Sequence, residues 1–559
     1  MQIQRFIVHT LAIFAVALLA RGDEPFAVAI RVDAAKTRGE LKPVWRFFGA
    51  DEPNYAYMKD GSKLLGELGE LRRGDVFFRP HNLLTTGDGT PALKWGSTNA
   101  YTEDADGTPR YDWTIVDRIF DTYLARGVRP YAQIGFMPKA LSVKPDPYQH
   151  QWTPKAKYDE IYRGWAYPPQ DFAKWEELVF EWAKHCVEKY GREEVERWYW
   201  ETWNEPNIGY WRGTREEFFQ LHDHAIAAVR RALPTAKVGG PDVAGGPGGN
   251  FLGEFLSHCL KAGTPIDFMS FHAKGWPEFV DGHVRMGISN QLKDIDRAFA
   301  VIAGFPELKS KPIVIGESDP DGCAACQGPQ LGYRNTTMYS SYTAASFARK
   351  YDLAERHGVN LEGALTWAFT FEDQPLFAGF RQLASGGLDL PVLNVFRMFA
   401  AMGGQRVAAE SDGALNLDEM LKSGVRGRPD VAALASLDQK KLCILVWHYH
   451  DDDMPGPDAT VELSITGLPF GDRTARVRHF RIDRSHSNSF EAWKQLGSPE
   501  SPTPEEYVAL EKAGHLAPLH PDQMLETRNG AVTIRFALPR QAVSLLEIDE
   551  SSDKPGLPK

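Results

Sequence analysis

The chain has 559 residues, of which 43% are hydrophobic and 25% are charged, and its formal net charge is −11. This length and composition predict a soluble protein of more than one domain, with ample chain for a hydrophobic core. An excess of acidic side chains disfavours nucleic acids and anionic membrane surfaces, because both are negatively charged. We therefore expect no nucleic-acid partner and no membrane partner, and the sequence leaves the oligomeric state open.

The first 20 residues have the pattern of a secretory signal peptide. Arg5 supplies a positive charge, residues 11–20 form a short apolar run, and small residues precede a cleavage point near Ala20. An uncleaved membrane anchor is the alternative, but the run is shorter than the roughly 20 residues that span a bilayer. No cysteine follows the run, so lipidation of the bacterial lipoprotein type is not indicated. The prediction is a secreted or periplasmic protein.

From about residue 45, apolar strand candidates alternate with amphipathic helix candidates such as 113–126, 171–190 and 214–233, a pattern typical of parallel β/α units. The strand candidates are residues 46–50, 75–82, 129–136, 197–205, 236–244, 267–274, 312–317 and 363–371. Eight such units predict an α/β fold, a (β/α)8 TIM barrel over residues 45–403. A doubly wound open sheet is the alternative, but no Gly-rich phosphate turn follows the first strand candidate.

After about residue 404 the pattern changes to short strands with few long helices between them. The candidates are residues 430–436, 442–449, 459–465, 474–481, 532–537 and 542–548. They predict an accessory C-terminal β-sandwich domain over residues 404–550. The N-terminal segment 21–44 contains one more strand candidate, which we expect to join this sandwich. Residues 481–503 read as a surface loop with a short helix, and residues 551–559 as a polar tail.

Five cysteines are few for a secreted disulfide scaffold. Cys186 shares a helical face with apolar residues, so we expect a buried thiol. Cys323 and Cys326 form either a local disulfide or two free thiols. A single Cys-x-x-Cys without a second pair is a poor zinc signal, and we expect no metal and no cofactor.

In a TIM barrel the active site lies where the strands end, and polar residues gather at those positions here. They are Arg79, His81 and Asn82 after the second strand candidate, Asn204 and Glu205 after the fourth, His272 and Lys274 after the sixth, Glu317, Ser318 and Asp319 after the seventh, and Glu372 and Asp373 after the eighth. This gathering predicts a catalytic mouth at the C-terminal face of the barrel.

Glu205 and Glu317 form the candidate catalytic pair. Residues 198–203 are mostly aromatic or β-branched, and Pro206 ends the strand, which leaves Glu205 at the rim. Strands four and seven lie across the mouth from each other, so both carboxyl groups can face one sugar. A carboxyl separation of about 5–5.5 Å implies a retaining glycosidase, and about 6.5–9.5 Å an inverting one. In the retaining case Glu317 attacks the anomeric carbon and Glu205 acts as acid and then base.

Asn204 is placed to bind the 2-hydroxyl of the sugar, whereas Glu201 lies deeper in the strand and is expected to form a buried ion pair, with Arg79 as its candidate partner. The other candidates for substrate binding are His81, Asn82, His272, Lys274, Tyr333 and Trp367. The first four can equally be polar caps of strand ends, and the two aromatic residues can equally belong to the core. A cation such as Lys274 would favour an acidic sugar, for example a uronic acid.

Several motifs together resemble glycoside hydrolase family 39, the β-xylosidase and α-L-iduronidase family. They are Trp203–Asn207, Val238–Pro241, Tyr131–Pro138 and Tyr111–Thr114 in the barrel, and Asp483–Phe490, Trp493 and Leu496–Pro499 in a region similar to the β-xylosidase C-terminal part. The resemblance implies a barrel followed by a β-sandwich, a retaining mechanism with Glu205 as acid/base and Glu317 as nucleophile, and no metal.

The sequence departs from the xylosidase pattern in two places. The family's xylosidases usually have Trp-Asn after the nucleophile, whereas Ser318 and Asp319 are closer to the iduronidase version. The segment from His272 to Gly275 is likewise similar to the iduronidase segment whose lysine meets the substrate carboxylate. The first interpretation is an exo-acting β-xylosidase acting on xylo-oligosaccharides. The alternatives are an iduronidase-like enzyme acting on uronic-acid ends and a non-catalytic carbohydrate-binding protein, and exo versus endo action stays open.

Overall fold

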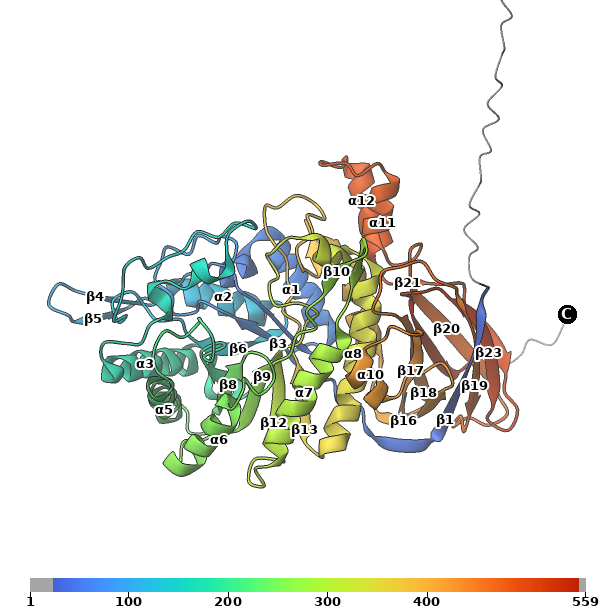
Figure 1. The fold of residues 1–559 in the computed structure, drawn as a ribbon, viewed down its shortest axis with the longest axis horizontal. Helices are drawn as coiled ribbons and strands as arrows, with labels where there is room; N and C mark the ends of the chain where they lie inside the picture. Colours follow the sequence, from blue (N-terminus) through green and yellow to red (C-terminus); the bar gives the residue numbers. More distant parts are fainter. Residues whose placement is uncertain (1–23, 552–559) are drawn as a thin grey trace, which may run out of the picture.

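The computed structural model describes residues 24–551, which form a barrel and a separate large sheet that lie side by side (Figure 1). The expected signal peptide at residues 1–20 and residues 552–559 of the expected tail lie outside the described residues. Across residues 24–551, none of the helices combines the length and the apolar character needed to cross a bilayer.

The barrel consists of eight parallel strands. In order around the barrel they are β2 (Phe47–Ala50), β3 (Val76–Pro80), β6 (Val128–Ile134), β7 (Tyr199–Thr202), β8 (Lys237–Val243), β9 (Phe268–His272), β12 (Pro312–Glu317) and β13 (Asn360–Ala364). The ring closes where Phe48 bridges Thr366, just beyond β13. The strands are almost entirely buried because the barrel interior covers one face and the helices cover the other. The predicted (β/α)8 barrel is confirmed.

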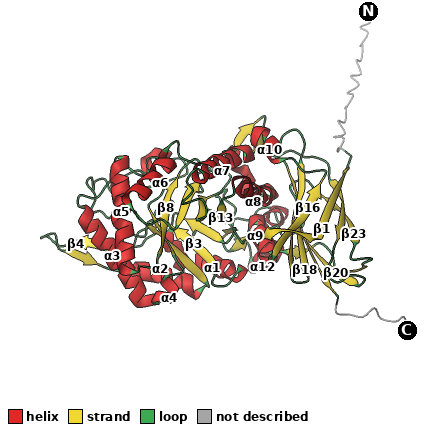
Figure 2. Cartoon of the chain, turned by 90° about the horizontal axis from the view of Figure 1, so that it is seen from below, coloured by secondary structure: helices red, strands yellow, loops and turns green. Residues whose placement is uncertain are grey.

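Helices surround the barrel strands (Figure 2). They are α1 (Lys59–Leu71), α2 (Thr114–Ala125), α3 (Phe172–Tyr190), α4 (Arg192–Val195), α5 (Arg215–Ala232), α6 (Phe251–Ala262), α7 (Ile288–Ala303), α8 (Thr337–His357) and α9 (Pro391–Ala401). The Asp171 side chain caps α3 by accepting from Ala173 N, and Thr214 and Glu217 form a capping box that begins α5. The three helices that the sequence predicts therefore appear within one residue of their expected bounds.

The eighth strand ends earlier than the sequence pattern indicates. The apolar run at residues 363–371 predicts a strand up to Phe371, but β13 stops at Ala364 and the last bridge to the barrel wall is that of Thr366. Glu372 accepts a hydrogen bond from Gly61 N in the first turn of α1, at 2.6 Å. The expectation that Glu372 marks a strand end at the mouth is therefore wrong, because this carboxylate holds the start of a helix.

The second sheet is mixed and folds around its own core. Along its main path the strands are β21 (Ala517–Pro518), β20 (Thr474–Ile482), β24 (Val543–Glu550), β18 (Lys441–Tyr449), β17 (Asp430–Asp438), β16 (Gln405–Ser411), β1 (Phe26–Glu40), β19 (Ala459–Thr466) and β23 (Val532–Leu538), and β22 (Gln523–Glu526) pairs with β20. Side chains from both halves of the path, such as Val28, Ile30, Ile444 and Val446, fill one core. The predicted β-sandwich is confirmed.

The N-terminal strand β1 belongs to this second sheet. It pairs in parallel with β19 and antiparallel with β16, so it lies in the middle of strands that come from the other end of the chain (Figure 1). The barrel is therefore inserted, in sequence, between β1 and the rest of the sandwich.

Helix α8 packs between the barrel and the sandwich. Ser341 Oγ donates to Gln541 Oε1 at 2.6 Å, and Arg349 lies 3.0 Å from Asp430 of β17. The rest of the chain forms the helices α10 (Leu417–Ser423), α11 (Ser489–Gln495) and α12 (Pro504–Gly514) and the hairpins β4/β5 (Tyr101–Glu103, Pro109–Tyr111), β10/β11 (Glu278–Val280, His283–Arg285) and β14/β15 (Ala384–Ser385, Leu388–Asp389). The segment after β20 is more helical than the sequence indicates, and its Trp493 ring packs 5.0 Å from Phe377 of a barrel loop.

Candidate active site

Glu205 lies at the mouth of the barrel, in a tight turn that follows β7. Trp203 and Glu205 have φ angles of 69° and 43°, a left-handed conformation that residues other than glycine rarely adopt. The turn is held by two hydrogen bonds, from Trp203 Nε1 to Tyr210 O at 2.9 Å and from Glu205 N to Asp242 O at 3.0 Å. The surrounding structure thus fixes a strained backbone that presents the Glu205 carboxyl group to the mouth.

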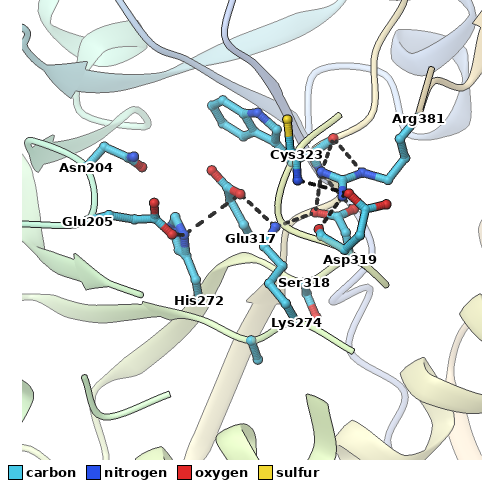
Figure 3. Close-up of polar contacts among 12 residues, drawn as sticks. Asn204, Glu205, His272, Lys274, Glu317, Ser318, Asp319, Cys323 and Arg381 are labelled. Carbon is cyan, nitrogen blue, oxygen red and sulfur yellow. Dashed lines mark hydrogen bonds and ion pairs between the residues drawn. The ribbon is translucent and has the colours of Figure 1, made fainter. Parts of the chain in front are cut away.

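Glu317 is the last residue of β12, and its carboxylate faces that of Glu205 across the mouth (Figure 3). Its Oε2 atom lies 2.6 Å from Lys274 Nζ and 3.8 Å from His272 Nδ1. Burial alone would raise the pKa of Glu317, but the positive charges of Lys274 and His272 outweigh it and lower the pKa to about 2. Glu317 is therefore ionised at neutral pH, as a nucleophile must be.

His272 connects the two catalytic candidates to a third carboxylate. Its Nδ1 atom lies 2.9 Å from Glu205 Oε1 and its Nε2 atom 2.7 Å from Asp242 Oδ2. Burial would lower the pKa of His272, but Asp242 and Glu317 raise it to about 10. Both ring nitrogen atoms carry a proton in the cation, so His272 donates to Glu205 and to Asp242 at once.

Arg79 lies beneath the two glutamates and binds the carboxylates of Glu201 and Asp242. Its guanidinium group is fully buried, contacts Glu201 Oε2 at 2.5 Å as the sequence predicts, and also pairs with Asp242. Arg79 Nη2 donates to Asn204 Oδ1 at 3.2 Å, which fixes the orientation of the Asn204 amide. Among the described residues, Asn204 Nδ2 has no hydrogen-bond partner. This buried amide therefore has a donor available for a substrate hydroxyl.

His81 and Trp367 line the opposite wall. His81 Nδ1 lies 2.9 Å from Asp51 Oδ1, its Nε2 lies 4.0 Å from Glu317 Oε1, and its ring centre lies 4.3 Å from that of Trp367. A Cβ atom at Gly49 would lie 2.5 Å from the Trp367 ring, so only glycine allows this close approach. The structure thus places His81 beside Glu317, and Trp367 against His81.

Two of the predicted substrate-binding residues have other roles. Asn82 Nδ2 donates to Asp51 O at 2.8 Å and its Oδ1 accepts from Thr85, so Asn82 shapes the loop after β3. Tyr333 is completely buried and its hydroxyl group bonds to Asp321 below the loop that follows β12. With no exposed ring face, Tyr333 cannot stack on a sugar, and that expectation is corrected here.

The loop after β12 also contains the disulfide that the sequence left open, between Cys323 and Cys326. Arg334 donates to the carbonyl groups of both cysteines, and Asp321 pairs with Arg334 and Arg381 at 2.8 Å each. Cys186 is a buried free thiol, as predicted. Within residues 24–551, no three His, Cys, Asp or Glu side chains are grouped so that they could hold a metal ion.

Sequence reasoning missed three charged residues of the site, Asp51, Lys94 and Asp242, and gave Asp319 no role beyond its place at a strand end. Asp51 directly follows β2, so the strand-end rule applied to the first strand would have found it. Asp242 lies inside β8, where burial hides its role, and Asp319 contacts Lys274 Nζ at 3.0 Å two residues beyond the nucleophile. Lys94 lies in an irregular loop whose sequence carries no periodic signal.

Aromatic side chains from long loops close over the mouth. Rings of Phe136, Trp165, Tyr162 and Tyr210 pack on one another, and the hydroxyl groups of Tyr158 and Tyr210 are 2.9 Å apart. As a result Glu317 is 5% exposed and the Glu205 side chain 13% exposed. Both carboxyl groups are thus largely buried beside a cluster of aromatic side chains, surroundings that suit stacking on a sugar ring.

A TIM barrel with two facing carboxyl groups at the ends of its fourth and seventh strands defines a glycoside hydrolase of the barrel type. The family "Glycosyl hydrolases family 39" matches residues 28–518, and the chain belongs to this family. The resemblance stated from the sequence is thereby confirmed, and the alternative of a non-catalytic carbohydrate-binding protein is set aside.

Individual relatives are distant but extend over most of the chain. A β-xylosidase of Geobacillus stearothermophilus is 26% identical over 92% of this chain and 95% of its own length. An α-L-iduronidase of Mus musculus is 25% identical over 89% of this chain and 77% of its own length. The crystal structure of a family 39 enzyme from Xanthomonas axonopodis pv. citri superimposes with a TM-score of 0.73 over 96% of this chain and 100% of that one, at 22% identity.

Proposed function

We propose that this family 39 hydrolase is an exported, retaining, exo-acting β-xylosidase that releases terminal xylose from xylo-oligosaccharides. The observation that carries the proposal is the single imidazole that both catalytic carboxyl groups approach. His272 Nδ1 lies 2.9 Å from Glu205 Oε1 and 3.8 Å from Glu317 Oε2, so these two oxygen atoms are no farther apart than the sum of the two distances, about 6.7 Å. For these two oxygen atoms the limit excludes most of the roughly 6.5–9.5 Å range of inverting enzymes, and it supports retention.

In the proposed reaction the Glu317 carboxylate attacks the anomeric carbon and forms a glycosyl ester. The bond from that carbon to the leaving oxygen breaks, and the Glu205 carboxyl group gives its proton to this oxygen. A water molecule then attacks the anomeric carbon, Glu205 takes the proton from the water, and the ester bond to Glu317 breaks. His272 and Lys274 hold the two carboxyl groups in place during both steps.

The enclosure of the site supports exo action. Both carboxyl groups are almost completely buried, and aromatic loops cover the mouth. An endo-acting enzyme needs an open groove for a chain that continues in both directions, whereas a terminal sugar fits a closed pocket.

The charges around the nucleophile support a neutral sugar. Lys274 is the residue whose charge would attract a uronic acid, but its ammonium group already lies 2.6 Å from Glu317 and 3.0 Å from Asp319. An ammonium group that two carboxylates already hold is a weak binding site for a third. The iduronidase-like alternative rests on this lysine and on the iduronidase relatives, so it is the second candidate.

Export is part of the proposal. The N-terminal sequence pattern supports it, and so does the Cys323–Cys326 disulfide, since disulfides persist in oxidising compartments. Expression of the full chain in a bacterial host, followed by N-terminal sequencing of the periplasmic product, tests this part. A mature N-terminus near residue 21 is expected, and retention of Met1 in the cytoplasm would contradict export.

The activity is tested by initial rates on 4-nitrophenyl β-D-xyloside and 4-methylumbelliferyl α-L-iduronide, for the wild type and for Glu317→Gln. Hydrolysis of the xyloside, lost in the variant, with β-xylose as the first product by proton NMR, is the expected result. Preference for the iduronide would replace the first candidate by the second. α-Xylose as first product would contradict the retaining mechanism.

A further inference from the structure

Lys94 is a buried cation beside the catalytic pocket with unused hydrogen-bond donors. Its side chain is 3% exposed, and its ammonium group donates to Asp51 Oδ2 at 2.9 Å and lies 5.1 Å from the centre of the Tyr158 ring. An ammonium group has three N–H donors, and in the described part of the chain Asp51 is the one acceptor that this group contacts. Because burying unfilled donors is costly, two of them await a ligand.

Hydrogen bonds from two loops fix the backbone of Lys94. Its φ angle is 58°, Lys94 N donates to Glu52 Oε1 at 2.6 Å, and His150 Nε2 donates to Lys94 O at 3.1 Å. A residue fixed in a left-handed conformation by two separate loops keeps its side chain in place before any ligand binds, which reduces the entropy cost of binding.

Asp51 and Lys94 form an ion pair in which Asp51 is negatively charged and Lys94 is positively charged. Burial would raise the pKa of Asp51, but Lys94 and His81 hold it well below its ordinary value. Burial would likewise lower the pKa of Lys94, but Asp51 raises it above its ordinary value. The pair therefore offers a carboxylate acceptor and ammonium donors side by side. A sugar hydroxyl both donates and accepts, so two adjacent hydroxyl groups match such a pair.

The pair lies on the side of the mouth away from the scissile bond. Asp51 follows β2, which is separated around the barrel from both β7 and β12, the strands that present Glu205 and Glu317. Asp51 Oδ1 contacts His81 Nδ1 at 2.9 Å, and His81 Nε2 lies 4.0 Å from Glu317. A pyranose with its anomeric carbon at Glu317 therefore extends across His81 toward Asp51 and Lys94.

Tyr158 joins this pair to the acid/base side of the pocket. Its hydroxyl group lies 2.9 Å from that of Tyr210. Burial raises the pKa of Tyr158 to about 12, and the charges of Lys94, Glu205 and Asp51 all act on it. The Tyr210 ring centre in turn lies 6.0 Å from that of His81, so Lys94 and the residues beside Glu317 border the same aromatic cluster.

We propose that Asp51 and Lys94 bind two adjacent hydroxyl groups at the non-reducing end of the terminal sugar and thereby determine specificity for an unsubstituted chain end. This inference rests on the proposed function and deepens it. A pocket that engages these hydroxyl groups directly has no space for a further sugar attached to either of them.

The test is a cycle that removes Lys94 and single hydroxyl groups of the substrate. The protein forms are the wild type and Lys94→Met, and the substrates are 4-nitrophenyl β-D-xyloside and its 3-deoxy and 4-deoxy analogues. Removing either partner is expected to lower kcat/KM roughly 10- to 100-fold, as for a hydrogen bond to a charged group. On the analogue that lacks the bound hydroxyl group, Lys94→Met should lower kcat/KM by less than a further factor of about 3.

The cycle distinguishes direct binding from a positioning role. If Lys94 only orients Asp51 and His81, the substitution lowers kcat/KM by the same factor on all three substrates, and the inference is overturned. Lys144→Met is the matched control, because Lys144 also lies over a tyrosine ring, 5.2 Å from the centre of Tyr167, but is exposed. It should leave all three rates unchanged.

Lys94→Met leaves the Asp51 charge buried without its partner, so its folding is checked by thermal unfolding. If this variant does not fold, the double variant Asp51→Asn/Lys94→Met removes both charges, and it should lose the same dependence on the substrate hydroxyl groups.

Calorimetric titration with D-xylose and 4-deoxy-D-xylose gives a readout that needs no turnover. Xylose affinity that falls in Lys94→Met, without hydrolysis of any xyloside by the wild type, would overturn the proposed function and keep the inference. If the wild type hydrolyses the xylosides and Lys94→Met lowers kcat/KM equally on all three substrates, the proposed function is kept and the inference is overturned. If the wild type neither hydrolyses a xyloside nor binds xylose, both the proposed function and the inference are overturned.

Discussion

Lys274 and Glu317 form a buried ion pair in which Nζ lies 2.6 Å from Oε2. The same ammonium group lies 3.0 Å from Asp319 Oδ2, so one cation stabilises two carboxylates. Lys274, which the sequence analysis offered as a binding residue for acidic sugars, is thus the ion-pair partner of Glu317, the proposed nucleophile.

Lys274→Met should move the acid limb of the pH profile of kcat/KM. The pKa of Glu317 is lowered to about 2, so in the wild type its charge is lost only as the pH falls through that value. Without Lys274 this pKa rises, and the acid limb should move up by roughly 1–2 pH units. Rates between pH 2 and 7 measure the shift, with Lys293→Met on the exposed side of α7 as control. An unchanged acid limb would show that Lys274 does not hold the charge of Glu317.

His272→Gln should alter how stability depends on pH. The pKa of His272 is raised from 6.5 to about 10 by Asp242 and Glu317 against the effect of burial. Its stabilising contribution is therefore complete below about pH 6.5 and is lost as the pH rises through about 10. Between these values the wild type should lose up to about 1.4 kcal/mol per pH unit relative to the variant.

Urea unfolding at pH 6, 8 and 10 measures this difference. His515→Gln, at a position where the side chain is 55% exposed, is the control and should follow the wild type. Parallel curves for the wild type and His272→Gln would mean that His272 is neutral in the folded protein.

Arg79→Met should destabilise the barrel strongly. It leaves Glu201 and Asp242 buried without the cation that pairs with both, and breaking a buried ion pair costs about 3–5 kcal/mol. The free energy of unfolding in urea measures the loss. Arg73→Met removes an arginine that is 72% exposed and should change the stability by less than about 1 kcal/mol. Equal effects of the two substitutions would contradict the view that Arg79 stabilises the barrel by pairing with Glu201 and Asp242.

Gly49→Ala should damage the pocket, whereas Gly253→Ala should not. A Cβ atom at Gly49 would lie 2.5 Å from both Arg79 O and the Trp367 ring, so the tryptophan must move and the affinity for sugar should fall. A Cβ atom at Gly253 in α6 would meet only Val301, at 3.7 Å, and alanine there should stabilise the helix by roughly 0.5–1 kcal/mol. Xylose titration and thermal unfolding of both variants test the contrast.

The barrel could be predicted because its signal is local. Most strands are short, largely apolar runs followed by polar residues, although β7 ends at Thr202, four residues before the Pro206 that the sequence analysis took as its end. The eighth strand was misplaced because Phe369 and Phe371 are buried although they lie beyond the barrel wall. An apolar run shows that a segment is covered, and it does not show what covers it.

The candidate site could be predicted only as far as it follows strand ends. His272 was found because it ends β9, but its simultaneous contacts with Glu205 and Asp242 depend on three strands that the sequence does not align. Lys94 went unnoticed for a similar reason. Its importance comes from burial and from missing acceptors, and neither is written in the residues around it.

The position of β1 has a consequence for how the chain is made. Glu40 pairs with Gln405 and Phe26 with Ala459, so β1 leaves the ribosome more than 360 residues before either of its neighbours. At about 5–20 residues per second this interval is on the order of tens of seconds, long enough for the barrel to close first. During that time β1 is an unpaired apolar edge that chaperones or a second nascent chain can bind. The yield of protein should therefore depend on this strand more than its distance from the pocket suggests.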